Sequence, residues 1–317
     1  MSAKKSFSWH VIRKTKCLGS SLLTLLAAIL LISTAACGQA AAKPSVTPAA
    51  TLQPGDSPRT LTVGGLERTY ILHIPPGLDS LRPMPVVFVF HGYTENAVYI
   101  QTMTSFNEIA DKNSFIVIYP NGINQSWNAS GCCGEAVNKN IDDFAFVRQM
   151  LAELGTIIRV DPKRIYAAGF SNGAIFSYRL ACEMSDTFAA IAPVEGWLLT
   201  NPCQPKQAVA VVDVHGSNDA YEGTTSQTLI NGVNTDVIYP PVEQAIATWV
   251  KLDGCTGNAQ VEKQGIVTHT VHASCKAGTA VEQYVIEGGS HTWPNMYAFP
   301  TASTQMIWDF FKAHPKQ

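Results

Sequence analysis

The sequence lacks an excess of basic residues: 22 lysines and arginines stand against 24 aspartates and glutamates. Five of the basic residues lie within the first 36 residues, which contain no acidic residue, so the rest of the chain is acidic overall. A chain without a basic stripe is not expected to bind nucleic acid or an anionic membrane surface. The sequence also lacks a CxxC pair, an internal repeat and a recognisable polysaccharide- or polyester-binding module. We therefore expect neither a nucleic-acid partner nor a metal site.

The N-terminus carries the pattern of a secretory signal. Basic residues precede an uncharged apolar run over residues 18–32, which is too short for a lasting membrane span. The next residues, "STAAC", resemble a bacterial lipoprotein cleavage box ending at Cys37, although Thr34 stands where such boxes carry leucine. We expect residues 1–36 to be a signal peptide and Cys37 to carry a lipid that anchors an exported chain at the cell surface. Ordinary cleavage with release of the chain is the alternative.

Residues 37–58 are rich in Ala, Pro, Thr and Ser and have no apolar period, which is typical of a flexible tether. We expect residues 59–317 to form a single catalytic domain. An exported chain with six further cysteines predicts disulfides. Closeness along the chain favours two bonds and leaves one vicinal pair; the three pairs are Cys182 with Cys203, Cys255 with Cys275, and Cys132 with Cys133.

Short apolar runs alternate with helical patterns throughout residues 59–317. The runs "PVVFVFHG", "SFIVIYP", "RIYAAGF" and "AVAVVDVHG" are continuous, which is typical of strands buried on both faces. Residues 96–112 and the segments "NIDDFAFVRQMLAELGTII" and "NGAIFSYRLACEM" are expected to be helices. This alternation predicts an α/β fold, with a mostly parallel central sheet and helices on both faces. Ligands of such sheets bind at the carboxyl ends of the strands.

The segment "GFSNG" places Ser171 between two glycines, where a predicted strand ends and a helix begins. A GxSxG at that junction is the pattern of a nucleophile elbow, whose small residues allow the strand and the helix to approach closely. Ser171 is therefore the candidate nucleophile; a serine in an ordinary glycine-rich turn is the alternative.

A serine nucleophile needs a base and an acid, which follow it in the order acid, then histidine. His291 lies in "EGGSHTWP", directly after an apolar strand, whereas His215 precedes the later acids. Asp219 follows the strand "AVAVVDVHG"; Asp213 and Glu222 are its rivals. We assign Asp219 to orient His291 and to stabilise its imidazolium.

The oxyanion formed during attack needs preorganised donors. One is expected from the backbone N–H of Asn172, at the start of the following helix. The second is expected from the loop "HGYTEN", with Tyr93 first and Thr94 second. His91 is expected to brace this loop, because it precedes Ser171 in the chain.

The blocks "VVFVFHGYTEN", "WNASGCCG", "VDPKRIYAAGFSNGAIFSYRLACE", "FAAIAPVEG", "HGSNDAY" and "GGSHTWP" resemble, in this order, the family of secreted feruloyl esterases and polyhydroxybutyrate depolymerases related to carbohydrate esterase family 1. The resemblance covers most of residues 59–317. It implies an α/β-hydrolase fold, no cofactor, and a triad of Ser171, Asp219 and His291. Asp213 departs from the apolar or histidine residue expected in such a strand.

We therefore expect a secreted serine carboxylic-ester hydrolase that acts through an acyl-enzyme on feruloyl or acetyl esters of plant cell-wall xylan. A polyhydroxyalkanoate depolymerase is the alternative; a peptidase and an inactive surface-binding protein are less favoured. The expected partner is an ester substrate on polysaccharide or polyester, with membrane contact only through a lipid anchor. Trp127 and Trp293 are candidates for the substrate pocket.

Overall fold

The computed structural model describes residues 53–79, 81–294 and 303–317, which belong to one compact unit. The predicted signal peptide, Cys37 and the tether up to residue 52 lie outside the described residues. The predicted tether extends too far, because strand β1 begins at Gly55 and pairs with β2 along its whole length. No helix within the described ranges is long and apolar enough to cross a membrane.

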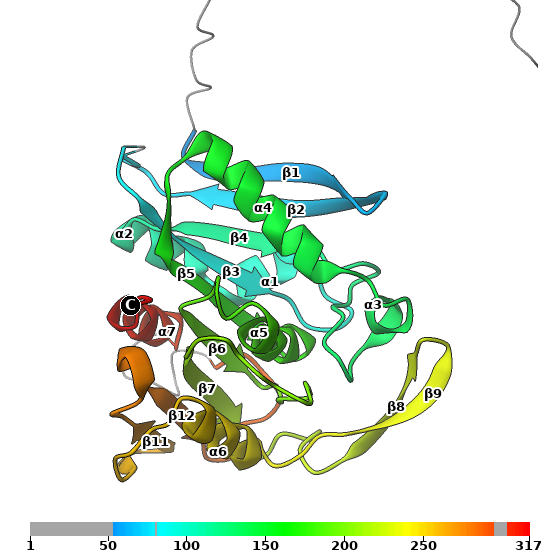
Figure 1. Cartoon of the computed structure of the whole chain (residues 1–317), viewed down its shortest axis with the longest axis vertical. Coiled ribbons are helices and arrows are strands. Elements are labelled where there is room, and N and C mark those ends of the chain that lie inside the picture. Colours follow the sequence, from blue (N-terminus) through cyan, green and yellow to red (C-terminus); the bar gives the residue numbers. More distant parts are fainter. Residues whose placement is uncertain (1–52, 80, 295–302) are drawn as a thin grey trace, which may run out of the picture. The chain divides into compact units, whose positions relative to one another are not determined.

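Ten strands of the described part form one sheet, in the spatial order β1-β2-β4-β3-β5-β6-β7-β12-β11-β10. The strands from β4 to β12 in this order run parallel, and the outer strands pair antiparallel. In chain order the ten strands are β1 (Gly55–Val63), β2 (Leu66–Ile74), β3 (Met84–Phe90), β4 (Ile116–Pro120), β5 (Val160–Phe170), β6 (Ala190–Val194), β7 (Ala210–Gly216), β10 (Gln260–Gln264), β11 (Val267–His272) and β12 (Val281–Ile286). Strands β8 (Thr225–Ile230) and β9 (Val233–Ile238) form a separate hairpin, which extends away from the sheet in Figure 1.

Helices cover both faces of the sheet, as predicted. Helices α4, α5 and α6 pack on one face and α1, α2 and α7 on the other, as Figure 1 shows. The helices are α1 (Ala97–Thr104), α2 (Phe106–Asn113), α3 (Gly134–Asn138), α4 (Asp143–Ile157), α5 (Asn172–Glu183), α6 (Val242–Leu252), α7 (Ser303–Ala313) and the 3₁₀ turn η1 (Lys276–Gly278). The single helix expected over residues 96–112 is two helices, because Ser105 adopts φ 53° between them.

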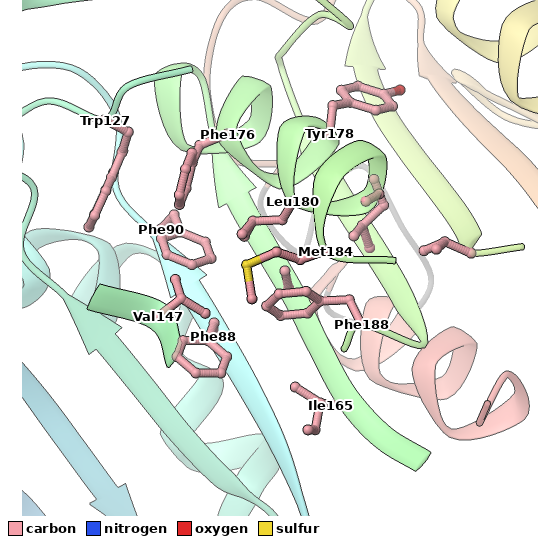
Figure 2. Close-up of a cluster of buried hydrophobic side chains, with 14 of the residues drawn as sticks. Phe88, Phe90, Trp127, Val147, Ile165, Phe176, Tyr178, Leu180, Met184 and Phe188 are labelled. Carbon is pink, nitrogen blue, oxygen red and sulfur yellow. The ribbon is translucent and has the colours of Figure 1, made fainter. Parts of the chain in front are cut away.

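The central strands are buried on both faces. In β3, Phe88 and Phe90 point towards α5 and its neighbours, whereas Val87 and Val89 point towards the opposite layer of helices. Figure 2 shows the first of these layers, in which Phe90 lies beside Phe176 of α5 and Phe88 lies near Phe188. Burying a side chain of this size contributes roughly 1.5–3 kcal/mol. The packed sheet is therefore a rigid platform for residues that follow its strands.

Candidate active site

Ser171 occupies the sharp turn between β5 and α5. Its backbone adopts φ 53° and ψ −116°, a region that a non-glycine residue enters at a cost of roughly 1–3 kcal/mol. Gly169 and Gly173 permit the turn: a Cβ on Gly169 would collide with the backbone of Gly173, and a Cβ on Gly173 would collide with the carbonyl of Phe90. The two glycines are therefore required by close approach of backbone segments, and the turn exposes the hydroxyl of Ser171 beyond the sheet.

The structure brings the three predicted triad residues together from distant parts of the chain. The Oγ of Ser171 lies 2.9 Å from Nε2 of His291, and Nδ1 of His291 lies 2.7 Å from Oδ2 of Asp219. With the proton on Nδ1, His291 donates to Asp219, and its Nε2 accepts from the serine hydroxyl. This arrangement can carry a proton from Ser171 to His291 while Asp219 holds the ring.

Asp219 is a buried carboxylate whose side chain has no exposed surface. Burial alone would raise its pKa, but the neighbouring ring of His215 and hydrogen bonds with His291 and the backbone N–H of Tyr221 hold the pKa of Asp219 well below its usual range. The group is therefore ionised throughout the neutral range. Its rivals lie elsewhere: Asp213 accepts from the hydroxyl of Tyr178, and the carboxylate of Glu222 accepts from a backbone N–H of α6.

The loops that carry Asp219 and His291 lie against each other. Gly216 and Gly289 approach so closely that a Cβ on Gly216 would collide with the backbone of Gly289. The backbone N–H of Asn218 donates to the carbonyl of Gly289 at 2.8 Å. Because neither loop can shift without the other, the separation of Asp219 and His291 is fixed by main-chain contacts.

In the loop after β3, two of the backbone N–H groups are already used in hydrogen bonds. The N–H of Gly92 donates to the carboxylate of Glu95, and the N–H of Thr94 donates to the carbonyl of Gln125. Among the bonds between described residues, none uses the N–H of Tyr93 or of Asn172. The N–H groups of Tyr93 and Asn172 thus stay the predicted oxyanion donors, whereas the N–H of Thr94 is already used by the carbonyl of Gln125.

His91 braces the same loop, as expected. Its ring is fully buried, lies 2.7 Å from the carbonyl of Gly92 through Nδ1, and accepts the N–H of Gly122 through Nε2 at 3.0 Å. Burial lowers the pKa of His91 to about 4. The ring is neutral at neutral pH and does not contact the nucleophile.

A cavity of about 1070 Å³ opens over Ser171 and His291. The hairpin β8–β9 and helix α3 form its outer walls, and the N–H of Gly232 in the hairpin turn donates to the side chain of Asn138 at 2.7 Å. Aromatic side chains make up much of the remaining lining: Tyr93, Tyr99, Trp197, Tyr221, Tyr239 and Trp293. The space is large enough for an extended organic substrate.

The two tryptophans predicted for this pocket have different positions. Trp293 lines the cavity, as expected. Trp127 does not: its ring is fully buried and stacked on Phe176, and its Nε1–H donates to the carbonyl of His91. The prediction for Trp127 is wrong because the ring is directed into the core beneath the loop that carries it.

All three predicted disulfides are confirmed: Cys182 with Cys203, Cys255 with Cys275, and the neighbours Cys132 with Cys133. The vicinal pair lies in the cavity wall. Its loop is held by the fully buried side chain of Asn172, which donates to the carbonyl of Cys132 at 2.9 Å and accepts from the N–H of Trp127 at 2.7 Å. This side-chain role of Asn172 was not predicted.

A buried histidine that is not part of the triad, His215, lies beside Asp219. In the described ranges, Glu195, His215 and Asp219 form the one group whose ligand atoms lie close enough to hold a metal ion. One oxygen of Asp219 already binds His291. Neither Glu195 nor a direct contact of His215 with Asp219 was predicted, since the sequence analysis rejected His215 as the base from its order in the chain.

Comparisons with known proteins place this site in a family. Feruloyl esterase B of Piromyces equi is 28% identical over an alignment of 261 residues that covers 77% of this chain and 45% of that protein. Poly(3-hydroxyalkanoate) depolymerase C of Paucimonas lemoignei is 25% identical over 70% of this chain and 58% of its own length. The chain thus spans about half the length of these two relatives.

A solved acetyl xylan esterase from Aspergillus awamori superposes with a TM-score of 0.56 at 16% identity, covering 81% of this chain and 99% of that chain. This likeness confirms the predicted α/β-hydrolase fold. The family model described as esterase PHB depolymerase matches residues 68–265, which include Ser171 and Asp219. Because that match covers more than half of the sequence, the chain belongs to the esterase PHB depolymerase family.

Proposed function

We propose that the protein is a serine carboxylic-ester hydrolase. Ser171 attacks the ester carbonyl while His291 takes its proton, and Asp219 stabilises the imidazolium. The N–H groups of Tyr93 and Asn172 receive the oxyanion. His291 then returns the proton to the leaving alcohol, and a water molecule activated by the same ring hydrolyses the acyl-enzyme.

The observation that carries this proposal is a pair of consecutive short contacts that join the three triad residues. Ser171 Oγ, the two ring nitrogens of His291 and Asp219 Oδ2 are joined at 2.9 and 2.7 Å. The rings of Trp197, Tyr221 and Phe170 lie around His291 at centroid distances of 6.1, 4.8 and 5.1 Å and limit its rotation. A nucleophile, a base and an orienting acid within hydrogen-bond reach are the parts that acyl transfer needs.

As substrate we favour a feruloyl or acetyl ester on a cell-wall polysaccharide. A relative is named feruloyl esterase, and the cavity offers aromatic faces that could stack on a planar acyl group. A polyhydroxyalkanoate depolymerase is the second candidate. It is favoured by large apolar side chains that are exposed at the cavity, namely Tyr93, Tyr99 and Leu229, which are 47%, 52% and 45% exposed.

We further propose that the protein is exported. Three disulfides in the described part are typical of an oxidising compartment. Anchoring through a lipid on Cys37 rests on the sequence pattern alone. Mass spectrometry of the mature N-terminus tests it: a lipid mass on Cys37 supports the anchor, and an unmodified start beyond Cys37 refutes it.

The decisive test of the activity is Ser171→Ala. The variant should lose ester hydrolysis and fluorophosphonate labelling while it keeps the wild-type melting temperature. Ser177→Ala is the matched control, because Ser177 lies on the next turn of α5 and bonds only the carbonyl of Gly173. Retained hydrolysis by Ser171→Ala would remove the proposal, and absence of labelling in the wild type would favour an inactive binding protein.

The substrate is tested by a turnover panel of methyl ferulate, acetylated xylan, hydroxybutyrate oligomers and a peptide ester with its matching amide. Fastest turnover of methyl ferulate or acetylated xylan supports the favoured substrate. Fastest turnover of hydroxybutyrate oligomers selects the depolymerase, and cleavage of the amide at a comparable rate selects a peptidase.

A further inference from the structure

The buried carboxylate of Asp219 lies between two histidines. Its Oδ2 is 2.7 Å from Nδ1 of His291 on the cavity side and 3.3 Å from Nε2 of His215 on the core side. The side chain of His215 is only 1% exposed, and neither of its ring nitrogens makes a hydrogen bond with a described residue. A fully buried imidazole that faces a carboxylate in this way needs an explanation beyond packing.

The charge of the resting site explains the contact. His291 must be neutral before it can act as a base, so it brings no positive charge to Asp219 in the resting state. A buried carboxylate without a counter-charge is strongly unfavourable. Burial works against a charged imidazolium at His215, but the neighbouring carboxylates outweigh burial and raise the pKa of His215 to about 9. His215 is the cation that the resting site requires.

Two further carboxyl groups face His215. Glu195 Oε2 lies 3.6 Å from Nε2, and Asp213 Oδ1 lies 4.0 Å from Nδ1. Burial raises the pKa of Glu195 to about 9, against the effect of His215. Burial also raises the pKa of Asp213, to about 7, although His215 and the hydroxyl of Tyr178 oppose this. A neutral Glu195 leaves Asp219 as the main partner of the His215 cation at neutral pH.

Glu195 links this pair to the rest of the site. It follows β6 at φ 51°, and its two carboxyl oxygens accept the N–H of Gly216 at 2.9 and 3.1 Å. Gly216 in turn touches Gly289 in the loop that leads to His291. A left-handed backbone at a buried glutamate is costly and marks a residue held for its contacts. Trp197, whose ring centroid is 5.3 Å from that of His215, covers the pair from the cavity side.

We infer that His215 is a positioning residue of the hydrolytic site. Its buried imidazolium is the resting counter-charge of Asp219, and the side chain of Glu195 fixes this pair to the end of β7 through the N–H of Gly216. The inference rests on the proposed function, because it assigns Asp219 to the triad. His215 touches neither Ser171 nor a substrate position, so it acts only through Asp219.

The test is the pH profile of kcat/KM in His215→Gln. Glutamine keeps a donor near the position of Nε2 and removes only the charge. Without that cation, the Asp219–His291 pair takes up a proton at higher pH, so the acid side of the profile should move up by about one pH unit. Loss of the ion pair that holds Asp219 in place should lower kcat about tenfold, with KM changed by less than about twofold.

His269→Gln is the matched control. His269 also pairs with a carboxylate, Glu282, at 2.8 Å, but on the outer strand β11 and away from the cavity. Its profile should be that of the wild type. Both variants are compared by melting temperature, so that loss of folded protein is separated from a shifted profile.

Glu195→Gln and Glu195→Ala form a second, independent pair. If Glu195 is neutral, the amide replaces it with little change in the profile, whereas alanine leaves the N–H of Gly216 unpaired and lowers kcat about tenfold or more. If His215→Gln does not fold, the two Glu195 variants test the inference in its place. Loss of activity in both Glu195 variants, or in neither, contradicts the inference.

If folded His215→Gln shows no shift on the acid side of its kcat/KM profile, the inference is overturned. Loss of wild-type activity in a chelator with recovery on adding Zn²⁺ also overturns it, since that would assign Glu195, His215 and Asp219 to a metal. Neither result removes Ser171 as the proposed nucleophile, which Ser171→Ala tests separately.

Discussion

Replacing Asn172 by alanine should destabilise the protein without removing the oxyanion donor. The backbone N–H at position 172 is unchanged, but the substitution deletes three buried bonds, with the N–H of Trp127 at 2.7 Å, the carbonyl of Trp127 at 3.3 Å and the carbonyl of Cys132 at 2.9 Å. Each of the two strongly bonded partners left unpaired in the interior costs about 1–3 kcal/mol. We therefore expect a loss of about 2–6 kcal/mol, which corresponds to a fall of about 4–24 °C in melting temperature.

The assay is thermal unfolding followed by circular dichroism, with ester hydrolysis measured below the transition. Asn172→Asp is the informative companion, because it keeps the acceptor for Trp127 but turns a carboxylate oxygen towards the carbonyl of Cys132. It should be least stable at neutral pH and recover on acidification. Asn113→Ala is the control, since the side chain of Asn113, at the end of α2, makes one hydrogen bond, to the carbonyl of Ile109. A fall below about 2 °C for Asn172→Ala would refute the role of this side chain.

Three further changes test the site and its support. Asp219→Asn should lower kcat about 10⁴-fold with KM retained in steady-state kinetics, because the amide favours the wrong tautomer of His291; a loss below tenfold would contradict its assignment. Gly173→Ala should abolish activity or soluble expression because its Cβ meets the carbonyls that end β3, whereas Gly155→Ala in α4, where a Cβ meets nothing, should raise the melting temperature slightly. His91→Gln should flatten the dependence of stability on pH. The pKa of His91 falls from 6.5 to about 4 on burial, so the unfolded chain binds the extra proton and wild-type stability declines as pH falls from 6.5 towards 4; a wild-type slope in urea titrations of the variant would count against this.

The triad could be predicted from the sequence because the constraints on it are local. Gly169 and Gly173 are needed at positions two residues before and after Ser171, where backbone segments meet. Asp219 and His291 each follow a strand of the parallel sheet, and the carboxyl ends of those strands share one edge. A pattern of strand ends in the right order is therefore sufficient to select these residues.

The cavity walls could not be predicted in the same way. In the hairpin, β8 alternates exposed and half-buried residues and β9 is mostly exposed, and neither strand has an apolar run, so nothing in its sequence marks it as a wall. Strand β6 lies within the sheet and was not predicted either, because it is short and contains alanine and proline, which have low strand propensity. For Trp127 the sequence shows an aromatic residue in a loop but not the direction of its ring, which depends on the core position of Phe176.

The order of residues along the chain also hid His215. The rule that the base follows the acid selects His291, whose ring contacts Ser171, but it says nothing about which groups a buried carboxylate needs around it. When His291 takes the proton of Ser171, Asp219 lies between two imidazolium rings, at 2.7 and 3.3 Å. The negative charge formed at the same moment on the substrate oxygen, close to Tyr93 and Asn172, restores the balance. The protein therefore needs a cation beside Asp219 before the reaction and an anion beside His291 during it, and the positions of His215 and of the two backbone N–H groups meet these two needs separately.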